Sequence, residues 1–123
     1  MDSSSERHTV QRYDGELNHL HYLVLEMGGL VIYQVRSALH ALNTRDVALA
    51  RKVIDRDREM ETAFEAILRR LMTRVLDDSR EASVVMSLVL AIKALERIGH
   101  HTQNLAEYVM LQVKGEITRD RDP

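Results

Sequence analysis

The sequence predicts an all-α fold, an antiparallel bundle of three long helices. Three observations lead to this prediction. Apolar residues recur at intervals of three and four through most of the chain, the only proline is the last residue, Pro123, and aromatic residues make up only 4% of the composition. At 123 residues the chain has the length of one domain.

The periodic segments give the three helices and their order. Apolar stripes run through residues 17–42, 47–75 and 85–113. Between them, residues 43–46 and 77–79 lose the periodicity and carry Asn, Thr, Asp and Ser, which favour turns and helix caps. Because both connections are short, neighbouring helices must run antiparallel.

The ends of the helical region are predicted from capping residues. Asp14 is the expected N-cap of the first helix and Gly115 the expected C-cap glycine of the third. We therefore expect a flexible N-terminal tail at residues 1–12, a three-helix domain at residues 13–115 and a charged C-terminal tail at residues 116–123.

Composition and motifs exclude several classes of function. The formal net charge is -2 with no basic half, so we expect no nucleic-acid binding. The absence of cysteine excludes disulfides and thiolate chemistry, and no phosphate-binding loop or nucleophile motif occurs, so we expect no enzyme. The N-terminus lacks a signal-peptide pattern and no apolar run reaches the ~20 residues of a membrane span. We expect a cytoplasmic protein that reaches membranes only through partners.

The apolar stripes are wider than one narrow bundle can cover. Residues on their margins include Val24, Leu30, Ile32, Leu90 and Leu105. Such width predicts association with a partner helix or, as we prefer, with a second copy in a six-helix homodimer.

Acidic residues interrupt the second stripe where apolar residues are expected. Steps of three and four from Ile54 reach Asp57 and Glu61, and in the third helix Glu96 and His100 are four residues apart on one face. An antiparallel hairpin that turns near residue 78 brings these four residues to one level. Carboxylates and imidazole from facing helices are the ligands with which bundle proteins bind iron or manganese.

Two readings of this level stay open on spacing alone. Arg56, Arg58 and Arg97 lie nearby, and acidic helix levels with arginines beside them more often form salt-bridge networks than metal sites. Gly28 and Gly29 fall near the same level of the first helix, where small residues permit close backbone approach or serve packing alone. A further basic cluster, made of residues 69, 70 and 74, is expected to be a solvated face.

Several stretches of the chain resemble the PhoU family of bacterial phosphate-signalling proteins. They are Tyr13-Asp14-Gly15-Glu16-Leu17, Met27-Gly28-Gly29-Leu30-Val31, Val53-Ile54-Asp55-Arg56-Asp57, Leu95-Glu96-Arg97-Ile98-Gly99-His100 and the segment from Asn104 to Gly115. The resemblance covers about residues 11–119. It implies a regulator without enzymatic activity that acts between the ATPase subunit of a phosphate ABC transporter and a phosphate sensor histidine kinase. When phosphate is plentiful, such a protein negatively modulates both.

The resemblance also implies a metal site on the residues already singled out. The family's acid-x-x-x-Asp motif, which can bind iron or another divalent transition metal, falls on Asp57 with Glu61 and on Glu96 with His100. Imidazole supplies no negative charge, so His100 in place of Asp favours a single ion over a bridged cluster. The chain carries one three-helix repeat where the family usually has two. The alternative to a phosphate regulator is a stand-alone metal-binding helical bundle.

Overall fold

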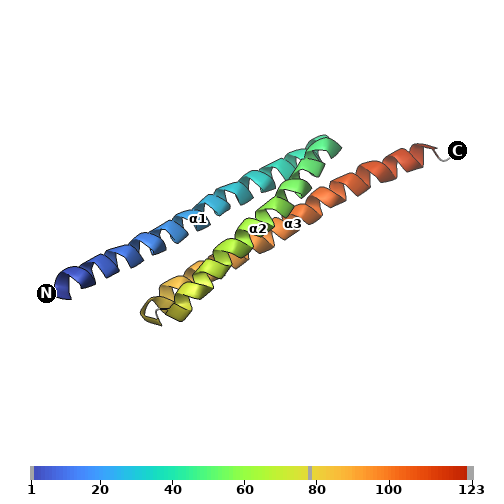
Figure 1. Ribbon diagram of the computed structural model, residues 1–123. Helices are drawn as coiled ribbons and strands as arrows, with labels where there is room; N and C mark the ends of the chain where they lie inside the picture. The colour runs from blue at the N-terminus through green and yellow to red at the C-terminus, as the bar shows by residue number, and fades with distance from the viewer. Residues whose placement is uncertain (1, 78, 122–123) are drawn as a thin grey trace.

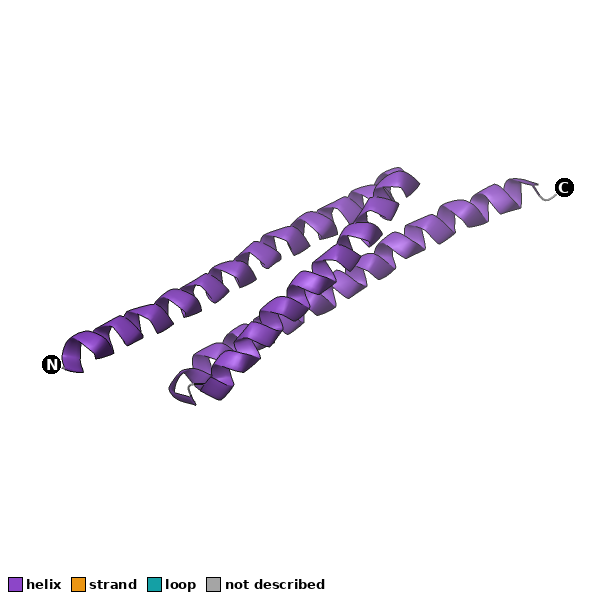
Figure 2. Cartoon of the chain, viewed as in Figure 1, coloured by secondary structure: helices purple, strands orange, loops and turns teal. Residues whose placement is uncertain are grey.

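Three long helices form an antiparallel bundle in the computed structural model (Figure 1). The structure describes the backbone of residues 2–77 and 79–121 and the side chains of residues 15–77 and 80–115. Helix α1 spans Asp2–Thr44, α2 spans Val47–Asp77 and α3 spans Ala82–Arg121, with a short 3-10 turn, η1, at Ser79–Glu81. Figure 2 shows helix throughout the described backbone and no strand. The all-α class and the three-helix architecture are confirmed.

The outer helices are longer than predicted at both ends of the chain. Asp14 lies inside α1 and is not its N-cap, and Gly115 lies inside α3 and is not a C-cap, because no glycine in the described backbone has a positive φ. Residues 2–12 and 116–121 are helical rather than separate from the helices. The physical reason is that neither segment contains a proline, and an isolated helical glycine costs only about 1 kcal/mol relative to alanine.

The turn between α1 and α2 is built by two residues. Arg45 takes the left-handed conformation with a φ of 61°. This lets the Asp46 backbone N–H donate to the carbonyl of Ala41 at 2.9 Å, the bond that closes a Schellman motif. The Asp46 carboxylate then accepts from the Leu49 N–H at 3.0 Å and caps α2. The predicted break at residues 43–46 is therefore confirmed, with Asp46 serving both helices.

The apolar core consists of two clusters along the bundle. The larger cluster, toward the α2–α3 turn, contains Leu20, Val24, Met27, Val31, Phe64, Ile67, Leu71, Val85, Leu88, Val89 and Ile92. The smaller cluster, toward the α1–α2 turn, is made of small residues and contains Ala38, Ala41, Ala50, Val53, Ile54, Ala106 and Val109. The small side chains allow the helices to approach closely near the short turn, whereas the large ones fill the wider end.

Between the two clusters lies a buried polar layer. It contains Gln34 of α1, Asp57 of α2 and Thr102 of α3, each no more than 5% exposed, together with the buried Gly99. Polar groups in a core need partners or a reason to be there, so this layer is the first place to look for function.

No helix in the described part of the chain has the length and apolar character that crossing a membrane requires.

Candidate functional site

The polar layer is centred on the Asp57 carboxylate, which is held inside the bundle by its position on α2. Asp57 occupies the stripe between Ile54 and Phe64 and is 3% exposed. Its Oδ2 atom is buried and has no hydrogen-bond partner. Its Oδ1 atom lies against Gly99 of α3, where an added Cβ would come within 2.8 Å. A Cβ at position 99 would therefore displace this carboxylate from its place.

The electrostatic surroundings of Asp57 favour its protonated form. Burial raises the pKa of the carboxyl above its ordinary value of 3.8 because the charged form loses its hydration. The charge of His100 opposes this rise in pKa, whereas the negative charges of Glu61 and Glu96 add to it. The other three residues that the sequence singled out therefore all act on the Asp57 carboxyl.

The structure brings Glu61 and His100 together at the rim of the layer. The His100 Nε2 atom lies 3.6 Å from the Glu61 Oε1 atom, and both side chains are about half exposed. At this distance and exposure the pair is a weak surface ion pair, formed only when the imidazole is protonated. The predicted shared level of α2 and α3 is thus confirmed by the Asp57–Gly99 contact and the Glu61–His100 pair.

As a metal site the layer is incomplete in this arrangement. No three histidine, aspartate or glutamate side chains among the described residues are placed to share one ion. Asp57 offers one partnerless oxygen from inside the core, and Glu61 and His100 face each other at the surface. As placed, these side chains do not converge on one point, and the metal-ligand set Asp57, Glu61, Glu96 and His100 stays a prediction.

The three arginines considered for a salt-bridge network do not pair with Asp57. The Arg56 guanidinium lies 5.2 Å from the centre of the Tyr33 ring, a cation–π contact, and its buried Nη1 atom has no hydrogen-bond partner. Arg58 and Arg97 are exposed. Within the described side chains, Asp57 therefore stands in the core without a cation bound to its Oδ2 atom.

Two members of the layer, Gln34 and Thr102, are not among the predicted site residues. Gln34 donates from Nε2 to the Val53 carbonyl at 2.7 Å, while its buried Oε1 atom has no partner. The Thr102 hydroxyl donates to the Ile98 carbonyl at 2.7 Å. A signal for Gln34 was present, since it lies three residues after the buried Val31 and four before the buried Ala38. The neighbouring Val35 fits the helical spacing almost as well, so the apolar stripe is assigned through Val35 when the sequence alone is considered.

The paired glycines of α1 do not line this layer. Gly28 faces Leu95, and a Cβ there would meet that side chain at 3.8 Å, an ordinary contact distance. Gly29 is exposed, with nothing within 4 Å of an added Cβ. Of the two readings left open for these glycines, close backbone approach is not observed, and Gly99 is the glycine in close contact with the layer.

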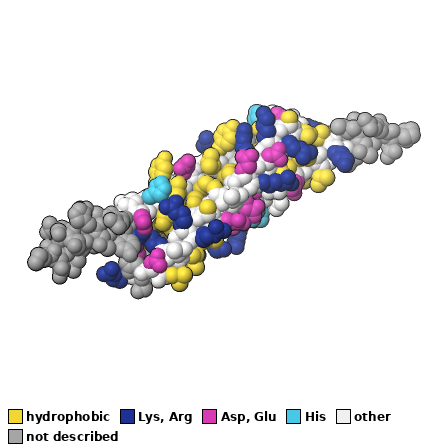
Figure 3. All heavy atoms as spheres, in the orientation of Figure 1, with side chains coloured by type: hydrophobic (Ala, Val, Ile, Leu, Met, Phe, Trp, Pro, Cys, Tyr) yellow, Lys and Arg dark blue, Asp and Glu magenta, His cyan; other side chains and the backbone are white. Residues whose placement is uncertain are grey.

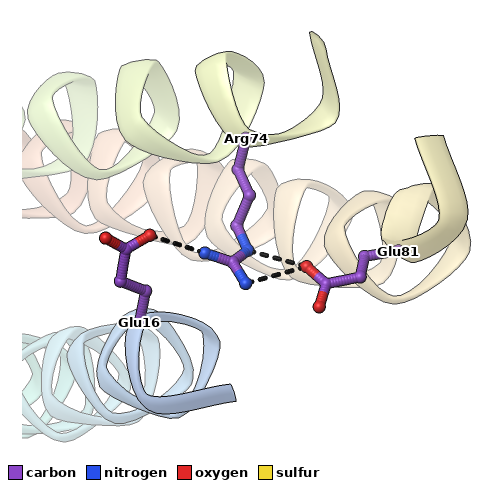
Figure 4. A network of polar contacts seen from close by, with 3 residues as sticks. All are labelled: Glu16, Arg74 and Glu81. Carbon is purple, nitrogen blue, oxygen red and sulfur yellow. Dashed lines mark hydrogen bonds and ion pairs between the residues drawn. The ribbon is translucent and has the colours of Figure 1, made fainter. Parts of the chain in front are cut away.

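A second polar cluster lies at the other end of the larger apolar cluster. Arg74 of α2 is buried and donates to Glu16 of α1 at 2.7 Å and to Glu81 of η1 at 2.9 Å (Figure 4). The guanidinium of Arg74 on α2 thus links α1 and η1 near the α2–α3 turn. Arg74 is therefore not part of a solvated face, as its neighbours Arg69 and Arg70 are.

A groove of about 310 Å³ lies beside this cluster and away from Asp57. Its lining includes Arg69, Arg70 and Arg74 together with the acids Glu16 and Asp77. Both signs of charge line the groove, so it selects neither an anion nor a cation. We assign it no ligand and regard Arg74 as a structural group.

Comparison with known proteins identifies the family of this bundle. The family model for the PhoU domain matches residues 24–109, which include the polar layer, the smaller core cluster and all of the larger cluster except Leu20. The chain belongs to the PhoU family. PhoU proteins are accessory and regulatory proteins rather than enzymes, so the prediction of no enzymatic activity is confirmed.

Several named PhoU relatives resemble most of this chain. It is 35% identical over 102 residues to the phosphate-specific transport system accessory protein PhoU homolog of Pseudomonas putida, a match that covers 83% of this chain and 40% of that protein. The Pseudomonas aeruginosa homolog is 34% identical over 102 residues, covering 83% and 42%. The Escherichia coli protein, phosphate-specific transport system accessory protein PhoU, is 26% identical over 110 residues, covering 89% and 46%. The chain spans less than half the length of each, and no solved structure matches it.

Proposed function

We propose that this protein is a cytoplasmic regulator of phosphate uptake and signalling. In this role it negatively modulates a phosphate-specific ABC transporter, through the ATPase subunit, and a phosphate sensor histidine kinase when phosphate is plentiful. The observation that carries the proposal is the PhoU domain match over residues 24–109, together with relatives whose names place them in phosphate transport.

The structure is compatible with regulation by contact. Its helices expose large apolar side chains on their outward faces, among them Leu90, Tyr108 and Leu111 of α3. Exposed apolar and aromatic groups are the common anchors of protein interfaces. A PhoU-family bundle of this kind would act by occupying a partner surface rather than by transforming a substrate.

The test is alkaline phosphatase output in phosphate-rich medium, in a strain that lacks its own full-length PhoU regulator. Expression of this protein should restore repression of the enzyme. The control is Leu71→Asp, which places a charge at a fully buried core position and should prevent folding, so that this variant leaves output high. High output with soluble wild-type protein, or equal repression by Leu71→Asp, would refute the proposal.

We propose a stand-alone metal-binding bundle as the second candidate. The observation in its favour is the buried Oδ2 atom of Asp57, which lacks a hydrogen-bond partner beside the charges of Glu61, Glu96 and His100. Against it stands the lack of a converging group of three donors among the described side chains. Iron or another divalent transition metal is the cation class that mixed carboxylate and imidazole donors accept.

Metal content measured by inductively coupled plasma mass spectrometry tests this second candidate. Purified wild-type protein should retain metal, and Asp57→Asn with Glu96→Gln should lose it. The matched control replaces Glu59 and Glu107, exposed acids on the same two helices, by glutamine and should retain metal. Equal metal content in the two double variants would exclude Asp57 and Glu96 as ligands.

A further inference from the structure

Helix α1 has a second apolar face that points away from the bundle. Four large residues on it, Tyr22, Leu25, Ile32 and Leu39, are between 50% and 63% exposed. They lie on the side of the helix opposite the buried stripe that contains Val24, Met27 and Val31. Figure 3 shows apolar side chains at the surface along the edge of the molecule that α1 forms. Within one chain, no helix covers this face.

The spacing of this outward face is that of a coiled-coil seam. Positions 22, 25, 29, 32, 36 and 39 are separated alternately by three and four residues, the a and d pattern of a heptad repeat. The seam extends about 26 Å at 1.5 Å per residue. A helix with a heptad seam on its outer side is suited to pack against another helix along its whole length.

The seam is complementary to itself when two copies run antiparallel. Positions whose numbers add to 61 then face each other, so that 22 meets 39, 25 meets 36 and 29 meets 32. Gly29, which has open space around its Cα atom, lies opposite Ile32 of the second copy. Gly29, the smallest residue of the seam, would thus accommodate the branched Ile32 side chain of the second copy. Tyr22 of each copy would pack on Leu39 of the other at the two ends of the seam.

Charges at the seam give the pairing a register. Arg36 is the only charged residue at a seam position, and it is exposed in the single chain. In the antiparallel pair it lies opposite Leu25 and within one residue of the level of Glu26 in the second copy. Glu26 is also exposed, so two Arg36–Glu26 ion pairs, related by the twofold axis, can form across the seam. A parallel pairing would instead set Arg36 against Arg36.

We propose that the outward face of α1 binds a second copy of this chain, giving an antiparallel, twofold-symmetric homodimer with Gly29 opposite Ile32 at its centre. The two bundles then form a six-helix assembly joined through their α1 helices. A C2 interface requires one patch that complements itself, and both the size pairing and the charge pairing of this seam meet that requirement. The proposal stands independently of any role in phosphate control.

Sedimentation equilibrium over a micromolar concentration series tests the association. Wild-type protein should sediment as a monomer–dimer system. Ile32→Asp should weaken dimerisation at least about tenfold, because the dimer would bury an unpaired carboxylate at its centre. The matched control is Leu90→Asp on α3, at a position more than half exposed in the monomer as Ile32 is, and this variant should dimerise as wild type does. A wild-type monomer throughout the series, or equal weakening by both variants, would overturn the proposal.

Disulfide formation tests the register, and the chain has no cysteine to interfere. A mixture of Gly29→Cys and Ile32→Cys proteins, oxidised under mild conditions, should yield a cross-linked heterodimer. A mixture of Gly29→Cys and Leu90→Cys proteins should not. Efficient cross-linking of Ile32→Cys to itself, without cross-linking in the first mixture, would show a parallel seam and overturn the antiparallel one.

A charge-reversal pair tests the ion pairs. Glu26→Arg alone should weaken the dimer because it places two positive groups at each end of the twofold contact. Glu26→Arg combined with Arg36→Glu should restore the wild-type dissociation constant. If the double variant is as weak as the single one, Arg36 does not face Glu26 across the seam.

Discussion

Substitution of Gly99 by alanine should reveal how tightly the Asp57 carboxylate is held in the core. In an ordinary helix interior, replacing glycine by alanine stabilises the folded state by about 1 kcal/mol. At position 99 the new Cβ would lie 2.8 Å from the Asp57 Oδ1 atom and 3.9 Å from the Phe64 ring. Such overpacking typically lowers the free energy of unfolding by about 1–3 kcal/mol. We therefore expect Gly99→Ala to lower the free energy of unfolding by as much as about 2 kcal/mol.

The same substitution should change sign when the carboxylate is removed. In an Asp57→Ala background nothing obstructs the new methyl group, so Gly99→Ala should raise the free energy of unfolding by about 1 kcal/mol. The coupling energy in this double-mutant cycle is then about 1–3 kcal/mol. Gly115→Ala is the control, because no atom lies within 4 Å of a Cβ there and its effect should be the same in both backgrounds.

Urea unfolding followed by far-ultraviolet circular dichroism measures all six proteins of this comparison. The slope of the transition should stay constant, since the substitutions change local packing and not the surface exposed on unfolding. If Gly99→Ala stabilises the wild-type and Asp57→Ala proteins equally, Asp57 does not fill the space beside Gly99. The description of the polar layer would then be incorrect.

Three further predictions concern the buried polar groups. Because burial raises the pKa of Asp57, the folded state binds its proton more tightly than the unfolded state. The stability due to this group is therefore present below its ordinary pKa of 3.8 and is lost as pH rises through the raised value. The free energy of unfolding of Asp57→Asn minus that of wild type should become more positive as pH rises from about 4 toward neutrality. A difference that stays constant with pH would contradict the raised pKa of Asp57. Arg74→Ala should lower the free energy of unfolding by about 2–4 kcal/mol, since it removes a 4%-exposed side chain that binds Glu81 and Glu16, whereas Glu16→Ala, at the 61%-exposed partner, should cost under about 1 kcal/mol. Equal losses would mean that burial of the guanidinium is unimportant. Gln34→Leu should change stability by less than about 1.5 kcal/mol, because it removes one hydrogen bond together with the partnerless Oε1 atom, and a larger loss by chemical denaturation would show that this amide organises the layer.

Local patterns predicted the parts of this fold that depend on local chemistry. The fold class and the two turns follow from the helical period and from residues such as Asp46, whose capping bonds reach no further than Ala41 and Ala50. The ends of α1 and α3 could not be predicted in the same way. Asp14 and Gly115 have the composition of caps, but a helix continues through such residues when nothing else stops it.

The candidate site was predictable in position and not in detail. Register counting placed Asp57, Glu61 and His100 at one level because two antiparallel helices joined by a short turn have one possible alignment. Counting could not show that Gly99 takes up the Asp57 carboxylate, since this depends on side-chain rotamers. Arg74 was missed for a related reason: its partner Glu16 is 58 residues away in the chain, and an arginine on a helix is usually solvated.

The polar layer has a consequence for how the bundle specifies its own alignment. Two apolar clusters alone would tolerate sliding of one helix along another, because aliphatic side chains interact without directional preference. Gln34 bonds to the Val53 carbonyl of α2, and the Asp57 carboxylate fits only beside Gly99 of α3, so the layer ties all three helices at one height. Sliding by one turn would bury these polar groups against aliphatic side chains, and the free energy of desolvating them would no longer be offset by their present contacts. The same fixed height sets the position of the α1 seam relative to the rest of the bundle, so the buried layer also fixes the position of the surface that we propose binds a second copy.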